Sequence, residues 1–126
     1  MLGFLYLFLG GGIGTVCRYF VYVLTSNSGI TILGTLIINL IGSFLVGFFY
    51  SFFNQFKFST DVKNGVILGL IGGFSTLAAL NLEGFLFLQK GKFLIPFFYI
   101  TATIIFGLLL VYLGMLFFDF LVKFVK

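Results

Sequence analysis

Four long apolar runs, separated by short polar stretches, dominate the hydropathy pattern of this 126-residue chain. They extend from Leu2 to Leu24, from Ile30 to Phe53, from Val66 to Leu88 and from Phe93 to Phe118. A helix needs about 20 apolar residues to cross a hydrocarbon core of about 30 Å, and each run is long enough. The pattern predicts an all-α membrane protein in which four transmembrane helices form a single domain over residues 1–126.

The third run differs from the others because glycines and polar residues interrupt it near its middle. Its central stretch, GLIGGFSTLAALNLE, contains the adjacent pair Gly72 and Gly73, followed by Ser75 and Thr76. Lipid offers no hydrogen bonds to a broken helix, so protein, water or an ion must bind the released backbone groups. We therefore expect a helix broken near the midplane, of the kind that holds small ions. The alternative is a glycine-rich packing seam between helices.

Composition places the chain in a membrane. Hydrophobic residues make up 61% of it and charged residues 8%, with a mean hydropathy of +1.27, which no soluble domain of this size could bury. We expect a multi-pass protein of the cell membrane, in contact with lipid. The net charge of +4 is spread over ends and loops, so no nucleic-acid partner is expected. Without histidine, and with one cysteine, the chain has no metal-ligand cluster and no nucleophile–base pair, so an enzyme is not expected.

Polar residues from three runs fall at one depth. Asn39 lies near the middle of the second run, the break near the middle of the third, and Tyr99 and Thr103 one turn apart in the fourth. Such residues face the protein interior or water, so they indicate a polar path, or else hydrogen-bonded contacts between helices. Carboxylates and imidazoles are missing at this level, which disfavours a proton relay. Amide, phenol and hydroxyl donors, together with the positive edges of aromatic rings, favour a small anion.

Arg18 and Glu83 are the only charged residues well inside the apolar runs. The first and third helices are expected to point the same way, so both residues approach the same membrane face. They could pair at a vestibule and gather anions there. The alternative is that each side chain extends separately to the lipid headgroups.

Three stretches resemble the signature sequences of a known family. GGGIGTVCRY (residues 10–19), GTLIINLIGSFLVG (34–47) and GLIGGFSTLAALNLE (69–83) are similar to those of the Fluc fluoride channels, also called CrcB. YITATIIFGLLLVYLG (99–114) resembles the last helix of that family. The match covers nearly the whole chain, in the right order. The resemblance implies four-helix subunits that assemble as dual-topology, antiparallel dimers and conduct fluoride passively out of the cell, which lowers cytoplasmic fluoride.

The resemblance also implies roles for individual residues. A sodium ion, structural and not transported, would be held at the dimer interface by the backbone carbonyls of Gly72 and Ser75. A branched side chain at Gly72 is then expected to crowd the broken turn. Arg18 and Glu83 match the charged positions of the family. The positions that correspond to its pore-lining residues are Asn39, Thr76, Tyr99 and Thr103.

The chain departs from the family just after the double glycine. The usual Thr-Thr-Phe-Ser-Thr-Phe is replaced here by Ser-Thr-Leu-Ala-Ala-Leu, so the two phenylalanines whose ring edges face fluoride are absent. Gly107 and Val111 stand where further hydroxyls are expected. These changes are typical of the degenerate partner in a pair of unlike subunits, or of a diverged homodimer with impaired conduction. The diverged positions in the third helix are Leu77, Ala78, Ala79 and Leu80.

Two other functions remain as alternatives. A small drug/proton exporter also has four helices, but it needs a membrane-buried carboxylate in its first helix, and no acidic residue precedes Asp61 here. A non-conducting partner or assembly subunit of a heterodimeric membrane complex is compatible with the sequence. The lost phenylalanines favour that second alternative.

Overall fold

The computed structural model describes residues 2–27 and 32–125, and every regular element within them is helical. The expected start of the second helix at Ile30 lies outside the described residues. The elements in chain order are α1 (Leu2–Ser26), α2 (Leu33–Gln55), α3 (Thr60–Asn64), the π-helix η1 (Gly65–Ile71), α4 (Gly72–Phe74), α5 (Leu77–Gln89) and α6 (Leu94–Val125).

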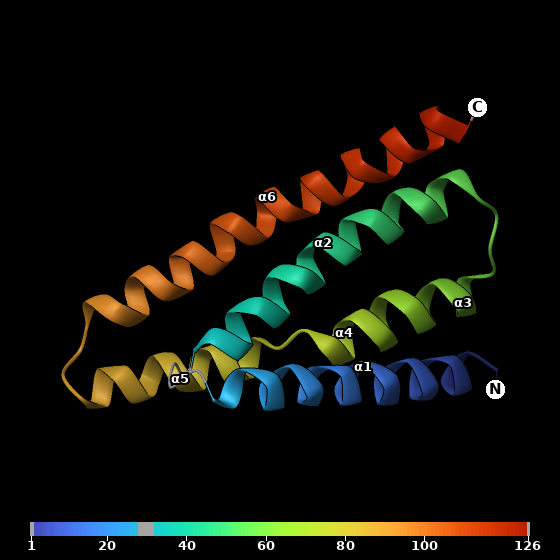
Figure 1. The fold of residues 1–126 in the computed structure, drawn as a ribbon. Helices are drawn as coiled ribbons and strands as arrows, with labels where there is room; N and C mark the ends of the chain where they lie inside the picture. The colour runs from blue at the N-terminus through green and yellow to red at the C-terminus, as the bar shows by residue number, and fades with distance from the viewer. Residues whose placement is uncertain (1, 28–31, 126) are drawn as a thin grey trace.

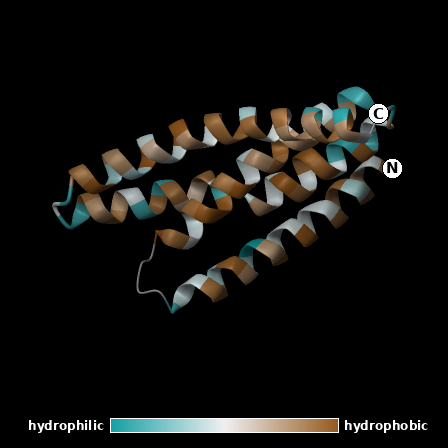
Figure 2. Cartoon of the chain, turned by 45° about the horizontal axis from the view of Figure 1, so that its top comes forward, coloured by the Kyte–Doolittle hydropathy of each residue, from teal (hydrophilic) through white to brown (hydrophobic). Residues whose placement is uncertain are grey.

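Within the described residues, four spans are long and apolar enough to cross a membrane: α1, α2, the composite 60–89 and α6. The first and third spans run in one direction and the second and fourth in the other, so both termini lie at the same end (Figure 1). Hydrophobic residues dominate along the helices, and hydrophilic residues gather mainly at the two ends (Figure 2). The chain is a multi-pass membrane protein, as the hydropathy pattern predicts.

Glycines let α1 lie directly against the first half of the third span. A methyl group at Gly10 would overlap the carbonyl oxygen of Gly65, and one at Gly73 would lie 2.7 Å from the carbonyl oxygen of Gly11. We call this contact the glycine seam. Small residues allow such close approach of helix backbones in membranes. The seam offered as an alternative to a helix break is therefore present, and the break exists beside it.

The helix break lies at Ser75 and Thr76, close to the middle of the third span. Both residues are extended, with ψ 157° at Ser75 and φ −151°, ψ 113° at Thr76. Helix α5 then begins at Leu77, where the Thr76 hydroxyl accepts a hydrogen bond from the Ala79 N–H at 3.4 Å. A serine or threonine is a favoured residue at this position of a helix. The predicted break is confirmed.

Gly72 does not take part in the glycine seam. It is exposed, and a methyl group there would meet only the Ile67 carbonyl oxygen, at 3.6 Å, which is an ordinary van der Waals distance. Within the subunit a single Cβ at Gly72 therefore crowds nothing, and the expectation for a branched side chain there stays a prediction. Its neighbour Gly73 is the glycine that tolerates no Cβ.

Helices α2 and α6 form the second close pair and lie side by side along much of their length (Figure 1). A methyl group at Gly47 would overlap the carbonyl oxygen of Val111. Near the C-terminal end of this pair, the Phe48 and Phe118 rings meet edge to face at 5.4 Å between centroids, a favourable aromatic geometry. A cavity lies between the two helix pairs, one formed by α1 with the first half of the third span and the other by α2 with α6.

Candidate functional site

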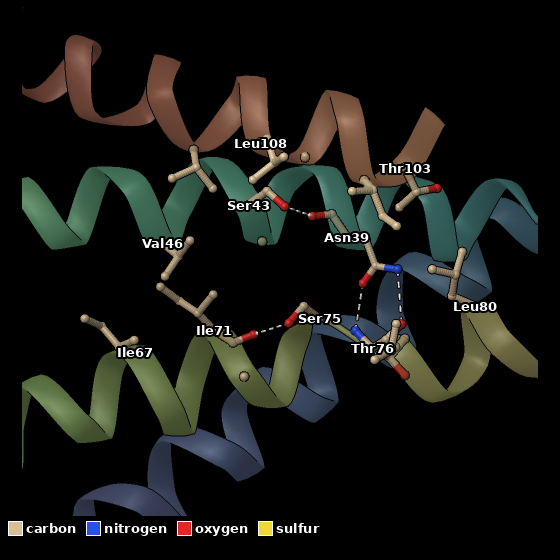
Figure 3. A pocket seen from close by; sticks show the side chains of 16 residues that line it. Asn39, Ser43, Val46, Ile67, Ile71, Ser75, Thr76, Leu80, Thr103 and Leu108 are labelled. Atoms are coloured by element: carbon tan, nitrogen blue, oxygen red, sulfur yellow. Dashed lines mark hydrogen bonds between the residues drawn. The ribbon is translucent and has the colours of Figure 1, made fainter. Parts of the chain in front are cut away.

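A cavity of about 420 Å³ lies beside the helix break, between α2, α6 and the two halves of the third span (Figure 3). Most of its lining is aliphatic or glycine. The predicted meeting of polar groups from three helices is confirmed. The polar residues that line the cavity are Asn39, Ser43, Ser75, Thr76 and Thr103.

Asn39 binds the backbone of the break directly. Its Oδ1 atom accepts a hydrogen bond from the Thr76 N–H at 2.8 Å, and its Nδ2 atom donates to the Thr76 carbonyl oxygen at 3.1 Å. The two dashed lines between these residues are visible in Figure 3. One side-chain amide on α2 therefore partners both backbone polar groups of an extended residue on another helix.

Ser43 is a cavity residue that the sequence reasoning missed. It lies one turn after Asn39 on the same face of α2, and its hydroxyl donates to the Asn39 carbonyl oxygen at 2.8 Å. The i,i+4 spacing from Asn39 was the signal that could have found it.

The break releases the carbonyls of Gly72 and Ser75, the two that the family resemblance implies as cation ligands. In a continuous helix the Thr76 N–H would donate to the Gly72 carbonyl, and the Ala79 N–H to the Ser75 carbonyl. Here these two N–H groups donate instead to Asn39 and to the Thr76 hydroxyl. The described residues contain no group of three His, Cys, Asp or Glu side chains suited to a metal ion. The carbonyls of Gly72 and Ser75 are thus backbone oxygens without their helical N–H donors, a type of ligand that small cations accept.

Tyr99 and Thr103 lie one turn apart, as expected, but face different surroundings. Thr103 is buried and lines the cavity, and its hydroxyl donates to the Tyr99 carbonyl oxygen at 2.7 Å. The Tyr99 ring lines a separate apolar groove beside Leu36 and Phe98. Its hydroxyl donates to Glu83 Oε2 at 2.8 Å. Of the two residues, Thr103 is the one at the cavity.

Both carboxylate oxygens of Glu83 accept hydrogen bonds from hydroxyl groups. Besides Tyr99, the Thr35 hydroxyl donates to Glu83 Oε1 at 2.6 Å, and the Tyr22 hydroxyl lies 3.0 Å from Thr35 Oγ1. The network joins α1, α2, α5 and α6. Sequence reasoning missed Thr35 and Tyr22, although Thr35 lies one turn before Asn39 on the same face of α2.

Arg18 does not take part in the Glu83 network. It lies half-buried on α1. Among the described residues it forms no ion pair with Glu83, whose two oxygens are both bound to hydroxyls. The sequence left open whether Arg18 pairs with Glu83 or each extends separately to the lipid headgroups. The structure does not show the pair.

The diverged positions occupy unlike environments. Leu77 and Leu80 both line the cavity, but Leu77 is 68% exposed and Leu80 only 2%. Ala78 and Ala79 are not among the residues that line it. Gly107 and Val111 line the cavity on the α6 side. The α6 wall is therefore apolar at the lining positions that follow Thr103 in the sequence.

Comparison with known proteins identifies the family. The family model of CrcB-like proteins, described as "Camphor Resistance (CrcB)", matches residues 5–115. The chain belongs to the CrcB family. A CrcB relative from Bacteroides fragilis, named fluoride-specific ion channel FluC, is 36% identical over 115 residues, which cover 87% of this chain and 91% of the relative.

Proteins of the same name occur in distant organisms. The FluC of Allorhizobium ampelinum is 39% identical over 114 residues, covering 88% of this chain and 91% of the relative. The FluC of Pyrococcus abyssi is 33% identical over 111 residues, covering 87% and 90%. The family resemblance seen in the signature stretches is confirmed.

Proposed function

We propose that the chain is a subunit of a fluoride-specific channel that lets fluoride leave the cell passively and so lowers cytoplasmic fluoride. The observation that carries the proposal is the cavity at the helix break, which gathers hydrogen-bond donors from three helices in a chain of the CrcB family. Its relatives are named fluoride-specific ion channels. The function is transport, and we propose no enzymatic role.

The chemistry of the cavity suits a small anion. Among the described residues no carboxylate lines it, so an anion that enters meets no negative charge from their side chains. Fluoride holds its hydration water tightly and needs donors to replace that water. Hydroxyl groups and an amide supply such donors, and a hydroxyl can turn its hydrogen toward a new acceptor.

A second subunit would complete the path. The cavity opens on the outer face of the subunit, where Gly72 and Leu77 are exposed. We propose an antiparallel dimer, either with a second copy or with a related four-helix subunit. A sodium ion at the interface, structural and not transported, would be held by the carbonyls of Gly72 and Ser75. Those carbonyls have lost their helical N–H donors, which supports the assignment.

One observation favours a second candidate function, that of a non-conducting partner in a heterodimer. Leu77 and Leu80 line the cavity where the family carries phenylalanine, and Gly107 and Val111 add no donors. A leucine fills space but presents no positive ring edge to an anion. The chain would then serve mainly to assemble and complete a pore supplied by its partner.

Fluoride efflux from liposomes tests the proposal. The purified chain is reconstituted alone and then together with a related four-helix subunit, and efflux is followed with a fluoride electrode. We expect fluoride efflux, faster with the partner than without it, and no chloride efflux. Folded protein that releases no fluoride in either case would refute channel function.

A further inference from the structure

One side chain binds both backbone polar groups of Thr76, the second residue of the break. The Asn39 amide accepts from the Thr76 N–H at 2.8 Å and donates to the Thr76 carbonyl at 3.1 Å. We call this pair of bonds the Asn39–Thr76 clamp (Figure 3). Asn39 lies on α2, so the clamp ties the break to the helix pair formed by α2 and α6.

The clamp stabilises the break because it replaces the hydrogen bond that the Thr76 N–H would form in a continuous helix. At membrane depth an amide without a partner is costly, because lipid cannot bind it. The Thr76 N–H would therefore be drawn to the Gly72 carbonyl, its partner in a continuous helix. With Asn39 in place, that N–H already has an acceptor. Thr76 can remain extended, and the Gly72 carbonyl remains free.

We propose that Asn39 is the positioning residue of the helix break: its amide holds Thr76 extended and so sets where the third span is interrupted. The hydroxyls of Ser43, Ser75 and Thr103 cannot take this role, because each donates to a carbonyl four residues earlier in its own span.

Amide hydrogen exchange tests the clamp in the wild-type protein without fluoride. The dimeric, nitrogen-15-labelled protein is placed in lipid nanodiscs, and exchange into heavy water is followed by NMR for residues 75–79. In the first turn of α5, Leu77 and Ala78 have N–H groups that the helix leaves without partners. We expect Thr76 to exchange several times more slowly than either. A Thr76 rate equal to that of Leu77 would overturn the proposal.

Two variants separate the clamp from general packing. Asn39→Leu keeps the approximate size of the side chain but cannot form the clamp, and we expect Thr76 exchange to become about tenfold faster. Amides of α6 should keep their rates, which a general loss of stability would not allow. Ser43→Ala is the matched control, because it removes a polar group of a neighbouring cavity residue on α2 and leaves the clamp intact. Unchanged Thr76 exchange in Asn39→Leu would contradict the clamp, and if that variant does not fold, the wild-type comparison still decides.

Fluoride efflux from liposomes distinguishes the clamp from the proposed function. A protein that keeps Thr76 protected but conducts no fluoride would refute the proposed function and leave the clamp standing.

Discussion

At the scale of single residues, Leu77 and Leu80 differ in how much room surrounds them. Both line the cavity, but Leu77 is 68% exposed in the subunit, whereas Leu80 is 2% exposed and belongs to the core. A larger side chain fits at the first position and must displace neighbours at the second. The two leucines that replace the phenylalanines of the family are therefore not equivalent.

This difference predicts opposite results for two phenylalanine substitutions. Leu77→Phe should raise fluoride efflux severalfold with little change in thermal stability, because a ring edge is added where space exists. Leu80→Phe should destabilise the subunit by about 1–3 kcal/mol through overpacking. Efflux from liposomes and thermal unfolding in detergent measure the two effects. Equal stability of both variants, with no gain in efflux from Leu77→Phe, would show that the rings do not matter here.

Among the helices, the adjacent residues Gly72 and Gly73 of the third span face different surroundings. Gly73 lies in the glycine seam against α1, and Gly72 faces away from it. Double glycines in a sequence cannot reveal which of the two packs against a helix, since that depends on the rotation of the span. The structure supplies that rotation.

The two glycines predict a contrast in stability. Gly73→Ala should lower the stability of the subunit by about 1–3 kcal/mol, because its methyl group would press on the backbone of α1 and not on a flexible side chain. Gly72→Ala should leave the subunit fold intact. Thermal unfolding of both variants in detergent measures the contrast. A destabilised Gly72→Ala subunit with a stable Gly73→Ala subunit would contradict the assignment of the seam.

The sequence predicts those features of the fold that depend on local pattern. The four spans follow from apolar length, and the helix break follows from Gly72, Gly73 and the polar residues after them. The position of the break does not follow, because Asn39 on another helix holds Thr76 extended. The π-helix η1 could not be predicted from hydropathy, because a helix with a wider turn contains the same apolar residues as an α-helix would.

Much of the candidate site could likewise be predicted from the sequence, but the orientation of its side chains could not. Asn39, Thr76 and Thr103 meet at the cavity as expected. The hydroxyl of Tyr99 is bound to Glu83, a contact between α6 and α5 that spacing along one helix cannot show. Contacts of this kind depend on how separate helices are rotated against each other.

At the scale of the whole molecule, symmetry decides how the diverged positions act. A homodimer repeats Leu77, Leu80, Gly107 and Val111 in every pore, because both subunits carry the same residues. A partner that retains phenylalanines would supply ring edges to a path that still uses Asn39 of this chain. The partnered form is therefore expected to conduct fluoride faster than the homodimer.

Two threonines on α6 can show whether fluoride crosses the membrane through the cavity beside the break. Thr103 is buried and lines the cavity, whereas Thr101 is exposed and does not line it. Thr103→Val and Thr101→Val both exchange a hydroxyl for a methyl group of similar size. Fluoride efflux from liposomes is measured for both variants, in the more active of the homodimeric and partnered forms.

We expect Thr103→Val to slow fluoride efflux about tenfold or more, since a hydrogen bond to an anion is lost, and Thr101→Val to conduct like the wild type. Equal efflux from the two variants, with both folded, would contradict passage through this cavity.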